Sequence, residues 1–563
     1  MNRKSFYTTI LTLLCAFTGP GLKAQIAGPQ SEIALMDLQR IQQLQDTLNN
    51  PARSFVLRSA SQLWDEQLNQ PHTGKSKPTA RLYQAGYTLQ SNSALSMGYN
   101  DGSLYPAIGM QQRFTLGAFL QWQGFSLQLQ PEFVSAANTA PAAFQADPAD
   151  PNYWARYYLY TANKIDEFDR FGNSAFTKVF AGQSSFRFNT RDISIGLSTE
   201  NLWWGPGIRN SLVLTNNAPG FLHLTFNSRK PIRTSWGNIE FQTILGKLDS
   251  AGVDAPYNAT MRTVWADGIA KKPNANRNLL GYTLSWNPKW TPNLHIGLTG
   301  AHYFYGTVVQ PQPSNLLTSW ENKTGGASLG SLFFRYAMPK EQAEVYLEYG
   351  RANRLATPFN IFGDTIPTGF TAGFRKIFLQ KNGAGIVLGA EITQLQLPDA
   401  RLIFNANNVF GIPKTNSWYT HPFVSQGYTN RGQVLGASIG PGSNSQTIHL
   451  SWVKGLKRIG LQAERVSHNN DFYQYNYFNG NYTNPLASGY SNKYWVDLSL
   501  GLNFQWDYKN LLLSGFYNYT SALNYRWVKL DGGFAGPSAL SDRRNSQFSL
   551  SLTYFFKKPN FTP

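Results

Sequence analysis

Cysteine is almost absent from this chain of 563 residues. The one cysteine of the sequence, Cys15, lies in an N-terminal stretch that we predict to be removed from the mature protein. A mature chain without cysteine excludes a disulfide framework and a thiol nucleophile. Any zinc site would have to be built from histidines and carboxylates.

Charged residues are also scarce, and acidic ones more so than basic ones. Asp, Glu, Lys and Arg make up 14% of the chain, with 31 acidic against 49 basic residues and a net charge of +18. No apolar run near 20 residues follows the N-terminus, which excludes a helical membrane protein. The hydrophobic fraction of 42% and the aromatic fraction of 14% exclude a disordered chain. These values leave a large β protein, either soluble or in an outer membrane.

The N-terminus has the form of a secretory signal peptide. Arg3 and Lys4 precede an apolar stretch from Phe6 to Phe17, and Ala24 supplies a small residue at the expected cleavage point. We therefore predict a signal peptide over residues 1–24 and an exported protein. Leu14 stands where a lipoprotein signal requires a small residue, so we expect no lipid anchor.

A short helical region follows the signal peptide. Apolar residues from Ile33 to Leu48 recur near helical spacing, with Ser31 as a possible N-cap and Pro51 as a stop. A second helix is expected over residues 54–69. We interpret residues 25–80 as an N-terminal helical periplasmic segment.

From about Arg81 onward the sequence alternates with a period of two. In the stretch from Tyr494 to Trp506, one face is aliphatic in the middle and aromatic at both ends, while the other is mostly small or polar. This pattern is typical of a strand that crosses a bilayer beside a polar lumen. The last such stretch ends near Phe556.

Connection lengths separate a membrane barrel from a soluble sandwich, whose strands also alternate. Tight connections such as Asn382-Gly383, a strong hairpin signal, take turns along the chain with long segments such as 397–445 and 467–493. Residues 432–440 fit better inside a long segment than as a strand. We therefore predict an all-β fold over residues 81–563. It is a transmembrane antiparallel β-barrel of about 18 strands, with both termini on one side.

Catalytic motifs give little support for an enzyme. Gly436-Ala437-Ser438-Ile439-Gly440 matches a nucleophile elbow, but that motif requires a strand-to-helix turn in an α/β sheet. The seven histidines show no paired-ligand spacing. We expect no enzyme activity, no cofactor and no metal, with an outer-membrane enzyme acting on glycan or lipid as the least favoured alternative.

Several polar and aromatic motifs occur in one order along the chain. They are Glu200 to Leu212 with its core Trp203-Trp204-Gly205-Pro206-Gly207, Leu214 to Leu224, Asn416 to His421, Gly427 to Gly436, Ile439 to Asn444, and His468 to Asp471. In these motifs the sequence resembles the Wzi family of capsule-assembly outer-membrane proteins. The resemblance implies an 18-stranded barrel with a helical periplasmic portion. It also implies a lectin-like anchor for capsular polysaccharide or exopolysaccharide rather than an enzyme.

Aromatic rings, amides and charged groups in the predicted loops suit a glycan, whose C–H faces stack on rings and whose hydroxyls need polar partners. The candidate binding residues are Trp203, Trp204, Arg209, Asn210, Trp418, Tyr419, His421, Arg431, Tyr473, Tyr475 and Tyr477. For any single Tyr or Trp of the long loops, a generic aromatic belt is the favoured explanation. Trp203 and Trp204 could instead be a wedge that packs a loop into the lumen.

The positive net charge favours anionic partners, namely an acidic polysaccharide and the lipid and lipopolysaccharide of the outer membrane. Nucleic acid is a poor alternative because the protein is exported and its charges are scattered. We expect a monomer in the outer membrane of a Gram-negative bacterium, with loops facing the exterior and both termini periplasmic. A channel or transporter for glycans or small solutes is the main alternative function.

Overall fold

Alternating strands close into one antiparallel barrel in the computed structural model. The structure describes residues 29–48, 52–59, 78–141, 153–253, 270–306, 326–352, 367–381, 383–398, 415–479, 494–527 and 542–556. The predicted signal peptide lies outside these residues. No helix in the described ranges is long and apolar enough to cross a membrane.

The described strands make 18 crossings, which confirms the predicted fold class. Three crossings are each built from two short strands: β4 with β5, β6 with β7, and β10 with β11. The barrel strands are β2 (Thr79–Asn92), β3 (Gly109–Trp122), β4 (Phe125–Leu129), β5 (Glu132–Ala136), β6 (Phe176–Phe180), β7 (Ser185–Asn189), β8 (Ile193–Ser198), β10 (His223–Ser228), β11 (Ile232–Thr234), β12 (Gly237–Leu248), β13 (Arg277–Pro288), β14 (Leu294–Tyr305), β15 (Gly326–Met338), β16 (Ala343–Ala352), β17 (Thr368–Leu379), β18 (Gly385–Gln394), β21 (Asn444–Lys454), β22 (Lys457–Ser467), β23 (Val496–Tyr508), β24 (Leu511–Leu523) and β25 (Arg543–Phe555).

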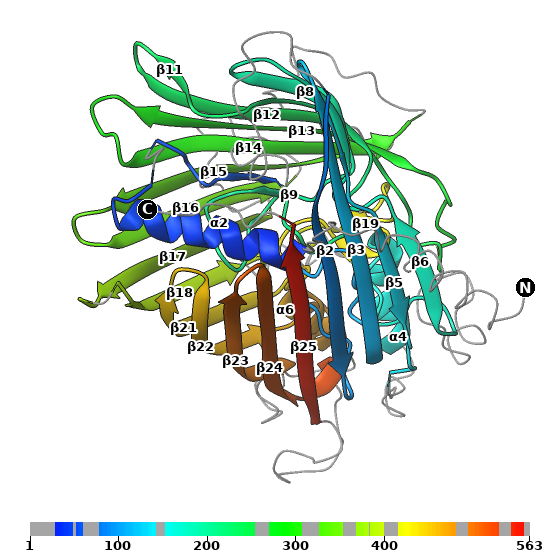
Figure 1. Ribbon diagram of the computed structural model, residues 1–563. Coiled ribbons are helices and arrows are strands. Elements are labelled where there is room, and N and C mark those ends of the chain that lie inside the picture. The colour runs from blue at the N-terminus through cyan, green and yellow to red at the C-terminus, as the bar shows by residue number, and fades with distance from the viewer. Residues whose placement is uncertain are drawn as a thin grey trace, which may run out of the picture.

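Closure comes from pairing of the first and last of these strands. β2 pairs antiparallel with β25, with Leu89 opposite Leu550. A closed sheet leaves no unpaired strand edge, which a lipid environment requires. Figure 1 shows the strands enclosing a central space.

The two faces of β23 differ as its sequence pattern predicts. Leu498, Leu500 and Leu502 are exposed on the outer face, whereas Asp497 and Ser499 are buried on the lumen side. Exposed apolar residues on neighbouring strands continue this outer belt. The belt is the surface that hydrocarbon covers.

Long and short connections lie at opposite ends of the barrel. On the short side, Gln380 N donates to Ala384 O over 2.8 Å and Gly383 has φ of +76°, as expected for a tight hairpin. Asn382 lies outside the described residues. On the long side, the described connections contain α4 (Tyr153–Tyr160), α6 (Asn470–Asn479) and the short 3₁₀ helices η1 (Ala162–Lys164) and η6 (Tyr525–Trp527).

The expected first helix is present as α2 (Pro29–Leu44), and it packs against the short-connection end of the barrel. One side of α2 packs in an apolar cluster with residues such as Leu512 and Phe555, and another side in a cluster with Ile377 and Val387. In Figure 1, α2 runs in dark blue across the space framed by the strands. Because the two clusters lie on different parts of the wall, α2 spans this end of the lumen.

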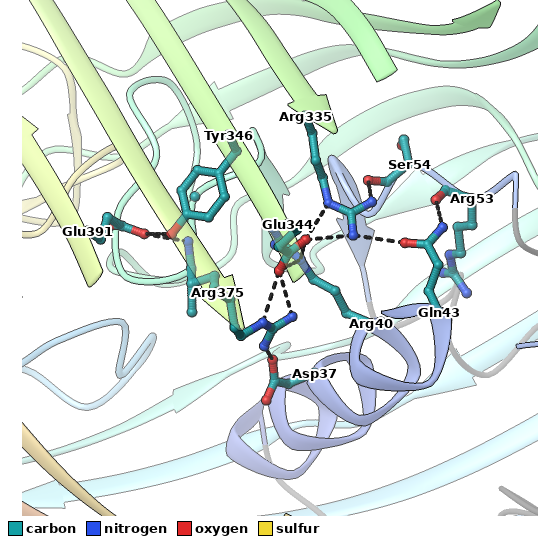
Figure 2. A network of polar contacts seen from close by, with 12 residues as sticks. Asp37, Arg40, Gln43, Arg53, Ser54, Arg335, Glu344, Tyr346, Arg375 and Glu391 are labelled. Atoms are coloured by element: carbon teal, nitrogen blue, oxygen red, sulfur yellow. Dashed lines mark hydrogen bonds and ion pairs between the residues drawn. The ribbon is translucent and has the colours of Figure 1, made fainter. Parts of the chain in front are cut away.

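A buried polar network fixes α2 to the wall (Figure 2). Glu344 accepts from Arg40 Nε over 3.0 Å, from Arg335 Nε over 2.8 Å and from Arg375 Nε over 2.9 Å. Asp37 of α2 bonds to both Arg375 and Arg458. Removal of one partner from such a buried charge network costs much, because it leaves an uncompensated buried charge.

The predicted helix over residues 54–69 is wrong at its start. Residues 57–59 form strand β1 (Leu57–Ser59), which pairs with β9 (Leu202–Trp204) in the lumen, with Leu57 opposite Trp204. The edge of β9 takes up the backbone hydrogen bonds of this segment, so pairing with a distant element overrides the local helical pattern. Residues 60–69 lie outside the described ranges.

Residues 432–440 lie in a long connection rather than in a barrel strand, as expected. Only Gln433–Val434 is extended there, as β20, which pairs with β19 (Thr429–Asn430) in a separate two-stranded ribbon. This ribbon is part of a connection that folds inward.

Candidate functional site

The Trp-Trp-Gly-Pro-Gly turn is folded into the lumen and buried. Trp204 is fully buried, and its Nε1 donates to Gln242 Oε1 over 2.9 Å. The guanidinium of Arg58 lies 4.4 Å from the centroid of the Trp203 ring. Gly205 has φ of +131°, and a Cβ there would lie 1.8 Å from Ser211 Oγ, so the turn requires glycine.

Arg209 and Asn210 anchor this turn to the opposite wall. Arg209 Nε and Nη2 donate to the two carboxylate oxygens of Glu464 over 2.9 and 2.6 Å. The backbone N–H groups of Ile208, Arg209 and Asn210 all donate to Glu391, at distances of 2.7 to 3.0 Å. The carboxylates of two barrel strands therefore hold this loop inside the barrel.

A second inward connection, residues 415–443, packs on the first. Trp418 and Tyr419 are buried in the same apolar cluster as Trp204. Tyr419 Oη donates to Leu212 O over 2.8 Å and accepts from Ala437 N over 2.7 Å. The motifs that carry the family resemblance thus meet in one core.

The remaining candidates are spread over the long-connection side. His421 Nδ1 accepts from Val424 N over 3.0 Å, and Arg431 pairs with Asp249 over 2.7 Å. Tyr475 is buried and stacks on Tyr160 with ring centroids 4.8 Å apart. The ring centroids of Tyr473 and Tyr494 are 4.4 Å apart. The side chain of Tyr477 lies outside the described ones.

An aromatic cavity of about 190 Å³ lies on the long-connection side. Its described lining contains none of the predicted glycan-binding residues. Its walls come from the connections after β2, β5 and β22, from the 415–443 connection, and from the start of β23 and η6. The aromatic lining residues are Tyr99, Tyr157, Phe168, Trp495, Tyr525 and Trp527. Of these, Tyr99, Tyr157 and Trp495 keep part of their surface accessible.

The rings around Trp495 form a connected group. Trp495 stacks on His468 with centroids 4.1 Å apart and makes edge contacts with Tyr525 at 4.9 Å and Trp527 at 5.2 Å. Asp497 accepts from His468 Nε2 over 2.9 Å and from Trp495 Nε1 over 2.8 Å. These contacts fix the orientation of the indole and the imidazole before any ligand arrives.

Three carboxylates line the cavity: Glu167, Asp169 and Asp497. Glu167 is accessible from the cavity, and within the described chain its carboxylate has no hydrogen-bond partner. Partial loss of bulk water raises the pKa of Glu167 to about 7, and the nearby His468 acts in the opposite direction. Asp169 forms an ion pair with Arg526.

Sequence patterns contained a weak signal for this cavity. Trp495 lies in the mostly small and polar row of the predicted strand, where a large aromatic residue is out of place. Tyr525 and Trp527 follow directly after another strand. Only the folded barrel places these strand ends together with loop residues such as Glu167.

A second cavity, of about 410 Å³, lies in the lumen between α2 and the Trp-Trp turn. Tyr99 lines both cavities, and the guanidinium of Arg209 lies 3.9 Å from the centroid of its ring. The pair Tyr99–Arg209 therefore stands between the upper and lower cavities.

The described residues show neither a metal cluster nor a nucleophile elbow. No group of three His, Asp or Glu residues in the described ranges is arranged to hold a metal ion. Ser438 Oγ donates to Asn210 Oδ1 over 3.3 Å, and its segment is a connection rather than a strand-to-helix turn.

Comparisons with known proteins agree with this architecture. A family model described as capsule assembly protein Wzi matches residues 99–519. Among solved structures, the chain is similar to Wzi of Escherichia coli, described as an outer-membrane protein involved in group 1 capsule assembly and a carbohydrate-binding β-barrel. The TM-score is 0.53 at 11% identity, covering 83% of this chain and 84% of that one.

OccAB2 of Acinetobacter baumannii is also similar, with a TM-score of 0.38 at 10% identity, covering 84% of this chain and 98% of that one. No curated protein matches the chain in sequence. The family match covers most of the barrel, including both inward-folded connections, and the structure has the same barrel fold as Wzi. This chain therefore belongs to the Wzi family of capsule assembly proteins, which are outer-membrane β-barrels.

Proposed function

We propose that this protein holds capsular polysaccharide or exopolysaccharide at the cell surface, through the aromatic cavity on the long-connection side. In this proposal the long connections face the exterior and both termini and α2 face the periplasm. The observation that carries it is the cavity itself, in which Trp495, its neighbouring rings and the Asp497 carboxylate hold one another in place.

The chemistry of the cavity suits a sugar chain. The C–H faces of a pyranose pack on aromatic rings such as Tyr99, Tyr157 and Trp495. Carboxylates such as Glu167 accept hydrogen bonds from sugar hydroxyls. Family membership supports a glycan as the ligand, and the solved Wzi structure is described as carbohydrate-binding.

The predicted candidates take different roles in this proposal. Trp203, Trp204, Asn210, Trp418 and Tyr419 hold the two inward connections together and do not touch the glycan. Arg209 acts on Tyr99 from beneath the cavity. His421, Arg431, Tyr473, Tyr475 and Tyr477 remain candidates for contacts of the chain outside the cavity.

The lumen favours holding over transport. The helix α2, strand β1 and both inward connections lie within the barrel, and the two cavities are separated at Tyr99 and Arg209. We propose a monomer that carries out no catalytic step and is surrounded by outer-membrane lipid and lipopolysaccharide. The channel is the second candidate, supported by the 410 Å³ cavity below this partition.

Retention of polysaccharide by cells tests the proposed function. A strain lacking the gene should release glycan into the medium while total synthesis is unchanged, and the wild-type gene should restore retention. Trp495→Ala should fail to restore it, whereas Trp290→Ala, which changes an exposed ring on the short-connection side, should succeed. Unchanged cell-attached glycan in the strain without the gene would contradict the proposal.

A further inference from the structure

The charge of the aromatic cavity differs in sign from that of the whole chain. The chain carries a net charge of +18. Of the described residues that line the cavity, none is Lys or Arg, whereas three are Asp or Glu. His468 is the remaining titratable nitrogen group in the lining.

The three carboxylates are not equivalent. Asp497 already accepts two hydrogen bonds, from His468 and Trp495, and Asp169 is paired with Arg526 behind the wall. Glu167 is the accessible carboxylate that has no partner among the described residues. The carboxylate of Glu167 is therefore the one best placed to accept a hydrogen bond from a sugar unit.

Nearby cations do not offset this charge from within the cavity. The guanidinium of Arg209 is bonded to Glu464 over 2.6 Å and lies beneath Tyr99. Lys164 Nζ lies 5.6 Å from the centroid of the Tyr160 ring, and neither residue lines the cavity. Arg526 pairs with Asp169 and is likewise not among the described residues of the lining.

We propose, building on the proposed glycan-holding function, that this cavity takes an uncharged sugar unit and rejects a uronic acid. The rings supply stacking for any pyranose, but the C6 carboxylate of a uronate would approach Glu167 and Asp497, and no Lys or Arg among the described lining residues would receive it. Like charges brought together in a partly desolvated site repel strongly. A hydroxymethyl group at the same carbon instead donates a hydrogen bond to Glu167.

In this proposal, the net positive charge of the chain does not decide which sugar unit the cavity takes. A positive chain favours an anionic polymer only where its cations face the ligand. The polymer can still carry acidic groups, provided that the unit in the cavity is uncharged.

Matched sugar pairs test the inference directly. The purified full-length barrel is titrated calorimetrically at pH 8 with two pairs of β-1,4-linked hexamers: glucose against glucuronate, and mannose against mannuronate. Within at least one pair, the uncharged hexamer should bind at least about tenfold more tightly, which corresponds to about 1.4 kcal/mol.

Variants of Glu167 locate the effect. Glu167→Gln should reduce the difference in affinity between the uncharged hexamer and the uronate hexamer. Glu167→Lys should remove or reverse that difference. Glu341→Lys makes the same charge change on an exposed short connection and should leave the preference intact. Trp495→Ala should weaken the binding of both members, which shows that they share one site.

Each outcome is decisive. Tighter binding of the uronate, or a preference that Glu167→Lys leaves unchanged, would overturn the inference while leaving the glycan-holding function in place. Failure of both uncharged hexamers to bind would also overturn it. The proposed function fails separately, if cells lacking the gene retain their polysaccharide.

Discussion

At the scale of single residues, the burial of two tryptophans distinguishes a structural role from a binding role. Trp204 is fully buried and bonded to Gln242, whereas Trp495 is part of a cavity wall and keeps some exposed surface. Trp204→Ala should lower the free energy of unfolding by about 3–5 kcal/mol, because it leaves a cavity and an unpaired amide. Thermal unfolding in detergent measures this loss.

Trp495→Ala is the comparison, and it should reduce glycan affinity with a smaller loss of stability. If Trp204→Ala instead folds with wild-type stability and loses only glycan binding, Trp204 is a contact residue and the role given to it here is wrong.

Glu167 gives the cavity a pH dependence. Because partial loss of bulk water raises the pKa of Glu167 to about 7, the group is mostly charged at pH 8 and mostly neutral at pH 6. The charged or titratable groups around it are Asp169, Asp497, His468 and, behind Asp169, Arg526. Uronate binding should therefore strengthen as the pH falls from 8 to 6, while binding of the uncharged hexamer changes little.

Calorimetry across this pH range checks the sign. In Glu167→Gln the dependence should disappear. A dependence that persists in this variant would rule out Glu167 as its source.

The Trp-Trp-Gly-Pro-Gly motif shows what the sequence alone can predict of a site and what it cannot. Sequence comparison singled out Trp203 and Trp204 and left open whether they bind sugar or act as a wedge. The structure shows both indoles buried, since Gln242 and Arg58 come from other elements that cover them. A local motif does not specify which distant residues will cover it, so the exposure of its rings was beyond prediction.

At the scale of elements, barrel strands were predictable because the alternation of apolar and polar residues within one strand indicates which face meets lipid and which meets the lumen. In β23, Leu502 is exposed on the lipid side and Asn503 lines the lumen cavity. Leu502→Lys should destabilise the barrel by about 2–4 kcal/mol, because the ammonium group enters hydrocarbon. Asn503→Lys, one residue away, should cost much less. Unfolding by urea in lipid vesicles compares the two, and equal losses would contradict the assignment of faces.

The helix α2 was predictable as a helix but not in its position. Its charged residues Asp37 and Arg40 look like an ordinary solvated face in the sequence, yet their partners Arg375 and Glu344 lie some 300 residues later. Such pairing depends on the closure of the barrel and leaves no local periodicity. For the same reason β1 was mistaken for the start of a helix, since its partner strand β9 is distant in sequence.

The Glu344 network predicts a large effect from a small substitution. Glu344→Gln removes the counter-charge shared by Arg40, Arg335 and Arg375, all of them buried. Uncompensated buried charge should lower the free energy of unfolding by about 3–5 kcal/mol. The control Glu341→Gln changes an exposed carboxylate on the neighbouring connection and should cost little. Equal unfolding midpoints for the two variants would show that the network contributes nothing.

At the scale of the whole molecule, composition indicated the barrel but not where its charges lie. A low charge fraction is what a lipid-facing belt requires, and the aromatic excess divides between the belt, the lumen core and the cavity. The net charge averages over all of these surfaces. It therefore could not show that the cavity lining contains carboxylates and no Lys or Arg among its described residues.

The helix and inward connections within the barrel are the feature of the whole molecule that most clearly favours holding over transport. Two apolar clusters and the bonds of Asp37 and Arg40 keep α2 at one end, while Arg209 and Tyr99 separate the cavities further in. In planar bilayers the wild-type protein should therefore pass little current. The double variant Asp37→Ala with Arg40→Ala should open more often, because α2 then loses its ion pairs to Glu344, Arg375 and Arg458 and keeps its apolar contacts and the bonds of Glu32 and Gln43. Replacing Lys340 and Glu341 by alanine removes the same charges from an exposed connection and should leave the barrel closed. A large steady current through the wild-type protein would instead favour the channel, since a lumen plugged in this way conducts ions only if α2 or the inward connections move aside.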